Sequence, residues 1–571
     1  MKKNQIIDLE ITDLSYEAMG VAHYEGMTVF VTNALPGEVV SAKILKVKKN
    51  FAFAKIEEIK KESPDRVKIK LNQWVQTGLA SLAHIKYDKQ LEFKRNQVVN
   101  LLKKAHLDEI EVGQTLPSPE QTGYRNKAQV PVREYNGQLE IGFFRRHSHD
   151  LVPLTNFFTT DPEIDRVLVA VRDVLRKYKI APYDEVNNTG IIRYLDVRRS
   201  KANGEIMVIL VSRVKDFPQM MGVAAEISQI PKVSGLVLNY NPKKTNVILG
   251  KKDYLVFGND QITDQIGDLK FRISPQSFFQ INSLQTPRLY DLAIKQADLG
   301  SDDVVIDAYS GIGTIGLSVA KHVKAVRGIE VVRDAIKDAK DNAELNGIEN
   351  AKYYLGKAEE IMPRWAKKGM KTDVVFVDPP RKGLTPEFIN ATVKTGPKKV
   401  VYISCNPATM IRDLLLFQEQ GYEFKRIDPV DMFPQTPHVE CVTKEEVNMI
   451  IKPLISEDEA KQTSKLFQTT WQETYKGVLP DVFLDNIPAT AWVKRLNESG
   501  RHNLVFKDDN NEVQAAVSYG RPRDTRMLGC GELMALYVKP DFQGYNVGKT
   551  LLNAAENELK KMGYGKIYLW C

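Results

Sequence analysis

Cysteine is scarce in this chain: four occur among 571 residues, at positions 405, 441, 530 and 571. Such few and scattered cysteines exclude a disulfide framework and suit a reducing compartment. No apolar run approaches the roughly 20 residues that cross a bilayer, and residues 1–5 lead into alternating polar and apolar residues instead of a secretory signal. We therefore expect a cytoplasmic protein without a membrane partner. Its length predicts three or four domains of about 100–200 residues each.

A strong charge of one sign is also missing, because the formal net charge is only +8. Residues 453–571 hold 15 basic and 15 acidic residues, so the whole excess lies in residues 1–452. A mild basic excess is compatible with binding to nucleic acid but does not establish it.

Residues 1–60 predict a small OB-like β-barrel. Short alternating strands around 7–11, 28–31 and 38–44 are separated by glycine and proline turns. Lysines interleave with Phe51 and Phe53, an arrangement in which bases stack on rings and lysines meet phosphates. A solvated hairpin with two core aromatics explains the same residues equally well.

Residues 61–265 predict a central α+β domain that binds RNA. Its basic residues could line an RNA groove, although ordinary surface charge would give the same pattern. They are Arg125, Lys127, Arg145, Arg146, His147, Arg193, Arg198 and Arg199.

Residues 266–452 predict an α/β, Rossmann-like domain. Short apolar strands at 304–307, 326–330, 373–378 and 399–404 alternate with expected helices, the first two at 314–322 and 333–346. Apolar strands with intervening helices are typical of a parallel, doubly wound sheet. Ligands of such sheets bind at the carboxyl ends of the strands, where all the motifs below occur.

A glycine-rich loop, Gly311-x-Gly313-x-x-Gly316, follows the first of these strands and opens a helix. It could bind NAD or S-adenosylmethionine through backbone N–H groups, and Glu330, which ends the second strand, could accept ribose hydroxyls. The discriminating element is Asp378-Pro379-Pro380-Arg381, because its two prolines form a rigid wall that hydride transfer does not require. Together with the cysteine described next, it favours the methyl donor. Gln280 could reach this cofactor, but a loop polar residue is the simpler interpretation.

Cys405 ends the strand 399–404 and precedes Asn406 and Pro407. A cysteine on a stiff turn at this edge predicts a thiolate nucleophile, whereas a lone cysteine elsewhere is usually structural. Addition of a thiolate to carbon 6 of uracil makes carbon 5 nucleophilic towards a sulfonium methyl. A base must then remove the proton from carbon 5. Glu440 is our first candidate and His438 the second, since a carboxylate in a partly dry cleft can be tuned towards neutral pH.

Residues 1–451 resemble the bacterial uracil-C5 RNA methyltransferases that make 5-methyluridine. The resemblance is carried by Phe278-x-Gln280-x-Asn282, the 307–316 loop, Asp378-Pro-Pro-Arg-x-Gly383, Ser404-Cys-Asn-Pro-Ala-Thr409 and Pro437-His-Val-Glu440. It implies S-adenosyl-L-methionine as cofactor, bound by Gln280, Tyr309, Glu330 and Asp378, with Cys405 as nucleophile and Glu440 as proton acceptor.

The N-terminal segment resembles a TRAM domain, which in that family favours the branch acting on 23S ribosomal RNA over the branch acting on transfer RNA. The target base would have to be flipped, or presented in a loop, to meet the thiol.

One departure concerns metal binding. Many relatives hold an iron–sulfur cluster on four cysteines, including a Cys-Gly-Gly-Cys element before a Gln-His pair. The matching stretch here is Thr77-Gly78-Leu79-Ala80-Ser81-Leu82-Ala83-His84, and no cysteine precedes Cys405. Because thiolates usually ligate such clusters, we expect no iron–sulfur cluster and no other metal.

Residues 453–571 resemble part of a GNAT N-acetyltransferase, with a strand at 532–538 and a helix at 549–562. In that family the turn between them binds the pyrophosphate of acetyl-CoA. Here the turn is Gln543-Gly544-Tyr545-Asn546-Val547-Gly548, with Asn in place of the middle glycine. The chain stops at Cys571 inside an expected strand, which would leave the sheet open. We therefore expect a truncated remnant rather than an active acetyltransferase.

Three alternatives to the ribosomal RNA enzyme remain. The same chemistry on transfer RNA is the nearest. An amino-group methyltransferase would place an aromatic residue after the two prolines and would need no cysteine, so Arg381 and Cys405 disfavour it. A non-catalytic RNA-binding or assembly factor would have no use for the nucleophile, the base and the cofactor loop.

Overall fold

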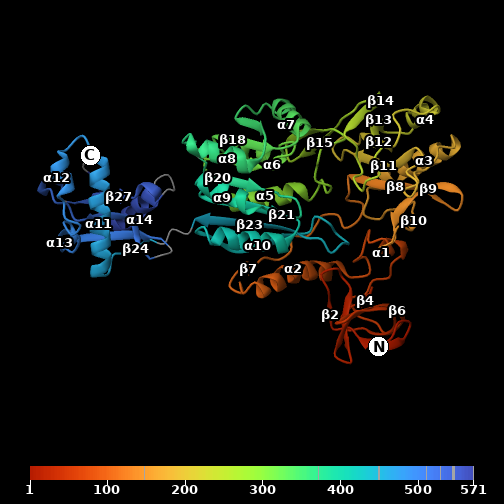
Figure 1. The fold of residues 1–571 in the computed structure, drawn as a ribbon, viewed down its shortest axis with the longest axis horizontal. Coiled ribbons are helices and arrows are strands. Elements are labelled where there is room, and N and C mark those ends of the chain that lie inside the picture. The colour runs from red at the N-terminus through yellow and green to blue at the C-terminus, as the bar shows by residue number, and fades with distance from the viewer. Residues whose placement is uncertain are drawn as a thin grey trace.

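The computed structural model describes residues 1–146, 148–370, 372–447, 451–508, 511–527, 529–542 and 547–569. The chain begins in a small barrel, passes through two sheet-based units, and ends in a separate unit at the far end from the barrel (Figure 1). Within these ranges no helix is both long and apolar enough to span a membrane. The predicted multidomain fold is confirmed.

The barrel is a six-stranded sheet whose alternating residues face one core. Ile7, Leu9, Val29 and Val31 are buried inside it. The rings of Phe30, Phe51 and Phe53 instead cluster with centroids 5.4–5.9 Å apart and remain partly exposed. The strands, in the order β1-β5-β6-β4-β3-β2, are β1 (Ile6–Glu10), β2 (Asp13–Leu14), β3 (Gly20–Tyr24), β4 (Met27–Thr32), β5 (Val39–Val47) and β6 (Phe51–Lys61).

The central unit is a seven-stranded sheet in the order β10-β9-β8-β11-β12-β13-β14, covered by α3 and α4. Strand β12 is buried along its whole length, as expected for a central strand. The elements are β8 (Lys127–Tyr135), β9 (Gln138–Phe144), β10 (Leu151–Pro153), α3 (Pro162–Lys177), β11 (Ile192–Arg199), β12 (Ile206–Ser212), α4 (Met220–Ile227), β13 (Val233–Tyr240) and β14 (Lys252–Gly258).

The third unit contains an eight-stranded sheet in the order β19-β18-β17-β20-β21-β23-β22-β7. Strands β17 to β21 are parallel, and β23 runs antiparallel to β21. The chain winds outward from β17 in one direction and resumes at β20 in the other, which opens a crevice at the carboxyl ends of these two strands. The strands are β17 (Val304–Ala308), β18 (Ala325–Glu330), β19 (Ala351–Leu355), β20 (Val374–Val377), β21 (Lys399–Ser404), β22 (Tyr422–Val430), β23 (Glu440–Val447) and, from far earlier in the chain, β7 (Glu111–Val112).

Helices cover both faces of this sheet and bury two apolar cores. One face carries α5 (Thr286–Ala297), α6 (Thr314–Ala320), α7 (Arg333–Leu345) and the hairpin of β15 (Ile262–Ile266) and β16 (Leu269–Ile273). The other carries α8 (Ala358–Lys367), α9 (Pro386–Lys394), α10 (Pro407–Gln418) and α2 (Tyr87–Lys104), which follows the short α1 (Gln73–Gln76). Helix α2 lies between the barrel and the eight-stranded sheet (Figure 1).

The C-terminal unit is a five-stranded sheet in the order β24-β25-β26-β27-β28. Of its predicted turn at 543–548, residues 543–546 lie outside the described residues, and Val547 and Gly548 begin α14. The elements are β24 (Ile451–Pro453), α11 (Glu457–Thr474), α12 (Asp481–Asp485), α13 (Val493–Leu496), β25 (Arg501–Lys507), β26 (Val513–Gly520), β27 (Cys530–Val538), α14 (Val547–Lys561) and β28 (Lys566–Leu569).

Candidate active site

The loop after β17 forms the floor of the crevice. Tyr309, Gly311 and Gly313 have φ angles of 64°, 53° and 86°, so the loop turns through the left-handed region three times. A Cβ atom on Gly313 would lie 2.4 Å from the hydroxyl oxygen of Tyr353. Only glycine fits at this position, because any side chain would clash with the Tyr353 ring.

Two acidic residues hold this loop through hydrogen bonds from its backbone N–H groups. The Asp307 carboxylate accepts a hydrogen bond from the Gly316 N–H (2.8 Å). The Glu330 carboxylate accepts one from the Gly311 N–H (3.1 Å), and its other oxygen accepts the N–H groups of Val331 and Val332. Glu330 therefore ties the glycine loop to the end of β18. Its contact with the ribose hydroxyls of the cofactor stays a prediction.

Gln280 and Asp378, 98 residues apart, meet on the opposite wall of the crevice. The Gln280 amide nitrogen lies 3.5 Å from an Asp378 carboxylate oxygen, and the Gln280 side chain is buried. The structure thus places Gln280 at the crevice and not in a surface loop. Its loop is anchored by Arg198, which donates to the carbonyls of Pro275 (2.7 Å) and Ser277 (2.8 Å).

The buried carboxyl groups of the crevice perturb one another. Burial raises the pKa of Asp307 to about 7, and the charges of Asp378 and Glu330 add to this shift. Burial and the Asp378 charge raise the pKa of Glu440 well above its ordinary value, and Arg381 offsets part of the shift. Among the described residues, no salt bridge neutralises Asp307, Asp378 or Glu440. A buried acidic cluster of this kind suits a ligand with a cationic centre.

This donor set fits S-adenosylmethionine. The buried Ser310 hydroxyl and one Glu440 oxygen have no hydrogen-bond partner within the described chain, so polar capacity is left for a ligand. When bound, S-adenosylmethionine supplies a methyl group on a positively charged sulfur.

Cys405 follows β21 directly and is partly exposed to the crevice. Asn406 caps α10 by accepting the Ala408 N–H (3.3 Å), and its amide donates to the carbonyl of Arg381 (2.8 Å). The Thr409 hydroxyl donates to the same carbonyl (3.3 Å). These bonds hold the cysteine turn against the Pro-Pro-Arg loop, so both move as one rigid unit.

The thiol of Cys405 sits between opposing charges. Burial, Glu440 and Asp378 raise its pKa to about 11, whereas the guanidinium of Arg381, which hydrogen-bonds the thiol, lowers it. Arg381 is thus the cation that favours the thiolate. Only its place directly after the two prolines could have indicated this role from the sequence.

We expect Arg381→Met to raise the pKa of the Cys405 thiol still further, because the cation that lowers this pKa is lost. At neutral pH the rate of iodoacetamide alkylation at Cys405 should fall roughly tenfold, as removal of an opposite charge within about 5 Å shifts a pKa by at least about one pH unit. Peptide mass spectrometry across a pH series measures this rate. Lys382→Met, at the next residue, is the control, and equal rates for both variants would refute the role of Arg381.

Glu440 begins β23 beside the nucleophile. Ser404 pairs with Cys441 in the antiparallel register of β21 and β23, which brings the following Cys405 next to Glu440. Partial burial and the cations Arg381, Lys94, Arg125 and Arg146 lower the pKa of His438 to about 4. His438 is therefore neutral at pH 7, although it lies near the same crevice.

The basic residues of the central unit divide into two groups. Arg193 is buried and donates to the carbonyls of Asn241 (2.9 Å) and Thr245 (3.0 Å), and Arg199 pairs with Asp161 (2.6 Å). These two, like the buried Arg198, are structural and cannot line a groove. Arg125 and Arg146 lie near enough to His438 for their charges to lower its pKa. Arg145 is exposed, burial and the Arg198 charge lower the pKa of Lys127 to about 8, and His147 lies outside the described residues.

Apolar packing fills the region around residues 77–84, which holds no cysteine. The Trp74 ring stacks on Phe158 with centroids 4.1 Å apart, and its N–H donates to the carbonyl of Asn156 (3.0 Å). Ala80 is buried in the same core. Within the described chain, no group of three or more His, Cys, Asp or Glu side chains could hold a metal ion.

The sheet, glycine loop and acidic cluster define an S-adenosylmethionine-dependent methyltransferase. The model of the tRNA (Uracil-5-)-methyltransferase family matches residues 86–447, that of the TRAM domain residues 2–56, and that of the GNAT acetyltransferase family residues 461–571. The first match covers more than half of the chain, which therefore belongs to the tRNA (Uracil-5-)-methyltransferase family.

Relatives agree with this assignment to an RNA (uracil-5-)-methyltransferase. The chain is 78% identical over 442 residues to an RNA methyltransferase of Lactobacillus johnsonii, covering 77% of this chain and 98% of that protein. An RNA methyltransferase of Streptococcus pyogenes is 49% identical over 444 residues, covering 77% and 96%. The structure of Pyrococcus abyssi tRNA (uracil-54, C5)-methyltransferase with S-adenosyl-L-homocysteine is similar, with a TM-score of 0.62 and 28% identity over 77% of this chain and 99% of that chain.

Proposed function

We propose that this protein methylates carbon 5 of a uridine in 23S ribosomal RNA through a covalent bond from Cys405 to carbon 6. The observation that carries the proposal is the juxtaposition of a thiol, a guanidinium and a carboxyl group from Cys405, Arg381 and Glu440 at one edge of the sheet. A nucleophile, a cation that favours its ionised form and a proton acceptor are the groups that this reaction needs.

Cys405 and Glu440 act one after the other in the proposed reaction. The Cys405 thiolate bonds to carbon 6 of uracil, which turns the ring into an enolate and makes carbon 5 nucleophilic. Once carbon 5 has taken the methyl group, the Glu440 carboxylate removes its proton. The electrons of that C–H bond re-form the C5–C6 double bond, and the C6–S bond breaks to release the thiolate.

We assign the cofactor to Gln280, Tyr309, Glu330 and Asp378, which line the two walls of the crevice. Glu330 and Gln280 are held by the bonds described above, so their polar atoms are preorganised. The buried acids Asp378 and Glu440 would be ionised more readily beside a cationic sulfur, because an opposite charge favours the carboxylate form.

The RNA would enter between the barrel and the central unit. Arg125, Arg146 and Arg381 lie around His438, and no salt bridge among the described residues occupies them, which suits the phosphates next to a flipped base. The partly exposed phenylalanine cluster of the barrel suits base stacking. We propose four domains: the barrel at 1–60, the central domain at 61–265, the catalytic domain at 266–452 and the appended domain at 453–571. We also propose that the protein acts in the reducing cytoplasm.

The choice between ribosomal and transfer RNA is tested by mapping 5-methyluridine in both RNAs from cells with and without the gene. We expect 23S RNA to lose one or more 5-methyluridines while transfer RNA is unchanged. Loss from transfer RNA alone would favour the alternative substrate, which the name of the Pyrococcus abyssi structure also suggests. An unchanged pattern in both RNAs would contradict the proposal.

A further inference from the structure

The loop 431–439 joins β22 to β23 and ends at Glu440. Its backbone carbonyls accept hydrogen bonds from segments that lie far away in the sequence, so the loop is fixed by side chains and not by regular structure. Four of the donors are side chains: Asn282 donates to the carbonyl of Met432 (3.2 Å), Lys94 to that of Phe433 (3.0 Å), Tyr124 to that of Pro434 (3.1 Å) and Gln97 to that of Pro437 (2.9 Å). The fifth is the backbone N–H of Leu82, which donates to the carbonyl of Gln435 (2.8 Å).

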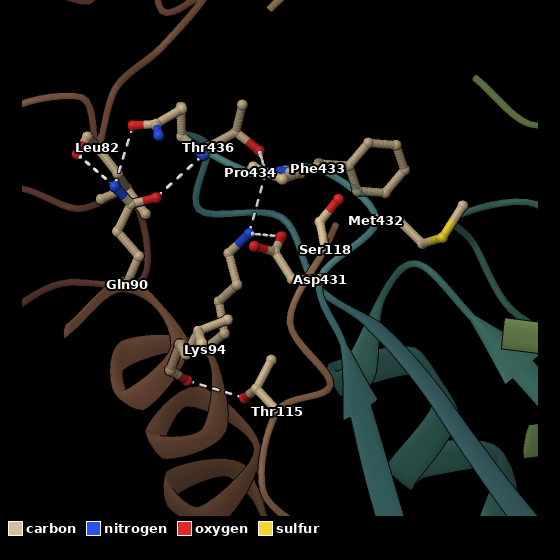
Figure 2. A network of polar contacts seen from close by, with 12 residues as sticks. Leu82, Gln90, Lys94, Thr115, Ser118, Asp431, Met432, Phe433, Pro434 and Thr436 are labelled. Carbon is tan, nitrogen blue, oxygen red and sulfur yellow. Dashed lines mark hydrogen bonds and ion pairs between the residues drawn. The ribbon is translucent and has the colours of Figure 1, made fainter. Parts of the chain in front are cut away.

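A buried ion pair lies at the start of this loop. The Lys94 ammonium contacts an Asp431 carboxylate oxygen at 2.5 Å, and both side chains are fully buried (Figure 2). The Tyr87 hydroxyl donates to the other oxygen at 2.9 Å. Asp431 directly follows Val430, the residue paired with Glu440 across β22 and β23. The ion pair is therefore one residue removed from the strand partner of the base.

Gln90, one helical turn before Lys94, holds the far side of the loop. Its amide oxygen accepts the Gln435 N–H (3.0 Å), and its nitrogen donates to the Gln435 side chain (3.0 Å) and to the carbonyl of Leu82 (3.1 Å) (Figure 2). Gln435 has a φ of 68°, a left-handed backbone that a residue with a Cβ seldom adopts. Such a conformation persists only where its surroundings enforce it.

We propose that Lys94, supported by Gln90, is a positioning residue for the proton-removal step. A buried ion pair contributes little net stability compared with apolar side chains of the same volume, so its place on α2 is explained by the geometry it imposes. The pair pins the loop that leads into Glu440 without touching the crevice itself. This role rests on the proposed function, because it assigns Glu440 as the group that takes the carbon 5 proton.

One turnover consists of two stages: formation of the methylated adduct, and its resolution after removal of the carbon 5 proton. Addition of Cys405 to carbon 6 and methyl transfer do not need a correctly placed Glu440. Removal of the carbon 5 proton does, and without it the C6–S bond cannot break. Misplacing the loop should therefore leave a methylated protein–RNA adduct that forms at a near-normal rate and resolves slowly.

The test uses the full-length protein, its RNA substrate and S-adenosylmethionine under single-turnover conditions. Lys94→Met alone leaves a buried unpaired carboxylate and can prevent folding, so the main variant is Lys94→Met with Asp431→Asn. Gln97→Leu, which removes the bond to the Pro437 carbonyl, is a milder second variant. Arg95→Met is the matched control, because Arg95 ties the same helix to the carbonyl of Val112 and not to the loop.

Adduct is measured on denaturing gels and released 5-methyluridine by mass spectrometry. For the double variant we expect adduct formation within about threefold of the native rate and release slowed about 10- to 100-fold, with a smaller delay for Gln97→Leu and none for Arg95→Met. Native release, or parallel loss of both steps, would overturn the positioning role. If the native protein formed no adduct at all, the covalent mechanism itself would fail, and this role with it.

Discussion

Replacing Cys405 with serine is expected to reduce methyl transfer to RNA by at least about 10⁴-fold, because loss of a covalent nucleophile removes the whole catalytic route. A serine hydroxyl ionises too weakly to add to carbon 6 of uracil. Binding of S-adenosylmethionine should persist, since Cys405 belongs to the nucleophile turn and not to the glycine loop. Transfer of a radioactive methyl group to RNA and calorimetric binding of the cofactor measure the two effects separately.

Cys530→Ser is the control for this change, because Cys530 is a free, partly exposed cysteine in the C-terminal unit. It should transfer methyl groups at the native rate. Residual transfer by the Cys405 variant within tenfold of native would show that the reaction does not pass through this sulfur.

Glu440→Gln is expected to lower the release of 5-methyluridine by about 10²- to 10⁴-fold, the usual contribution of a general base. The amide cannot take the carbon 5 proton, so the methylated adduct should accumulate and remain visible on a denaturing gel. The native enzyme should gain activity as pH rises towards the raised pKa of Glu440, since only the carboxylate accepts a proton. This dependence on Glu440 should disappear in the variant.

Glu445→Gln is the matched control. Glu445 lies on the same strand, is fully buried, and burial also raises its pKa well above its ordinary value. Its amide variant therefore removes a similarly buried carboxyl group from the same strand. Equal loss of product release in both variants would assign the effect to the strand's packing and not to proton transfer.

Residues at strand ends were accessible to sequence reasoning. Glu330, Asp378 and Cys405 each lie at or directly after an apolar strand, and the carboxyl ends of parallel strands share one edge of a sheet. The strand expected at 399–404 is β21 itself, and the strand expected at 373–378 contains β20. The meeting of these side chains in one crevice could therefore be predicted without coordinates.

Contacts between distant segments could not be predicted in this way. Lys94 and Asp431 are separated by 337 residues, and nothing in either neighbourhood indicates the other. Likewise, the basic character of Arg193 and Arg198 suggested an RNA groove, yet both are buried against backbone carbonyls. A sequence shows which residues are charged, but the direction in which a long side chain points depends on tertiary packing.

The proposed mechanism depends on a bond between the sulfur of Cys405 and carbon 6 of the target uridine. Substrate RNA carrying 5-fluorouridine tests it most directly, because fluorine at carbon 5 cannot be removed as a proton and the adduct cannot resolve. After incubation with S-adenosylmethionine and digestion, tandem mass spectrometry should find a methylated fluorouridine on the peptide that contains Cys405. Attachment at another residue, or a complete absence of cross-linked peptide under conditions that methylate normal RNA, would contradict the account.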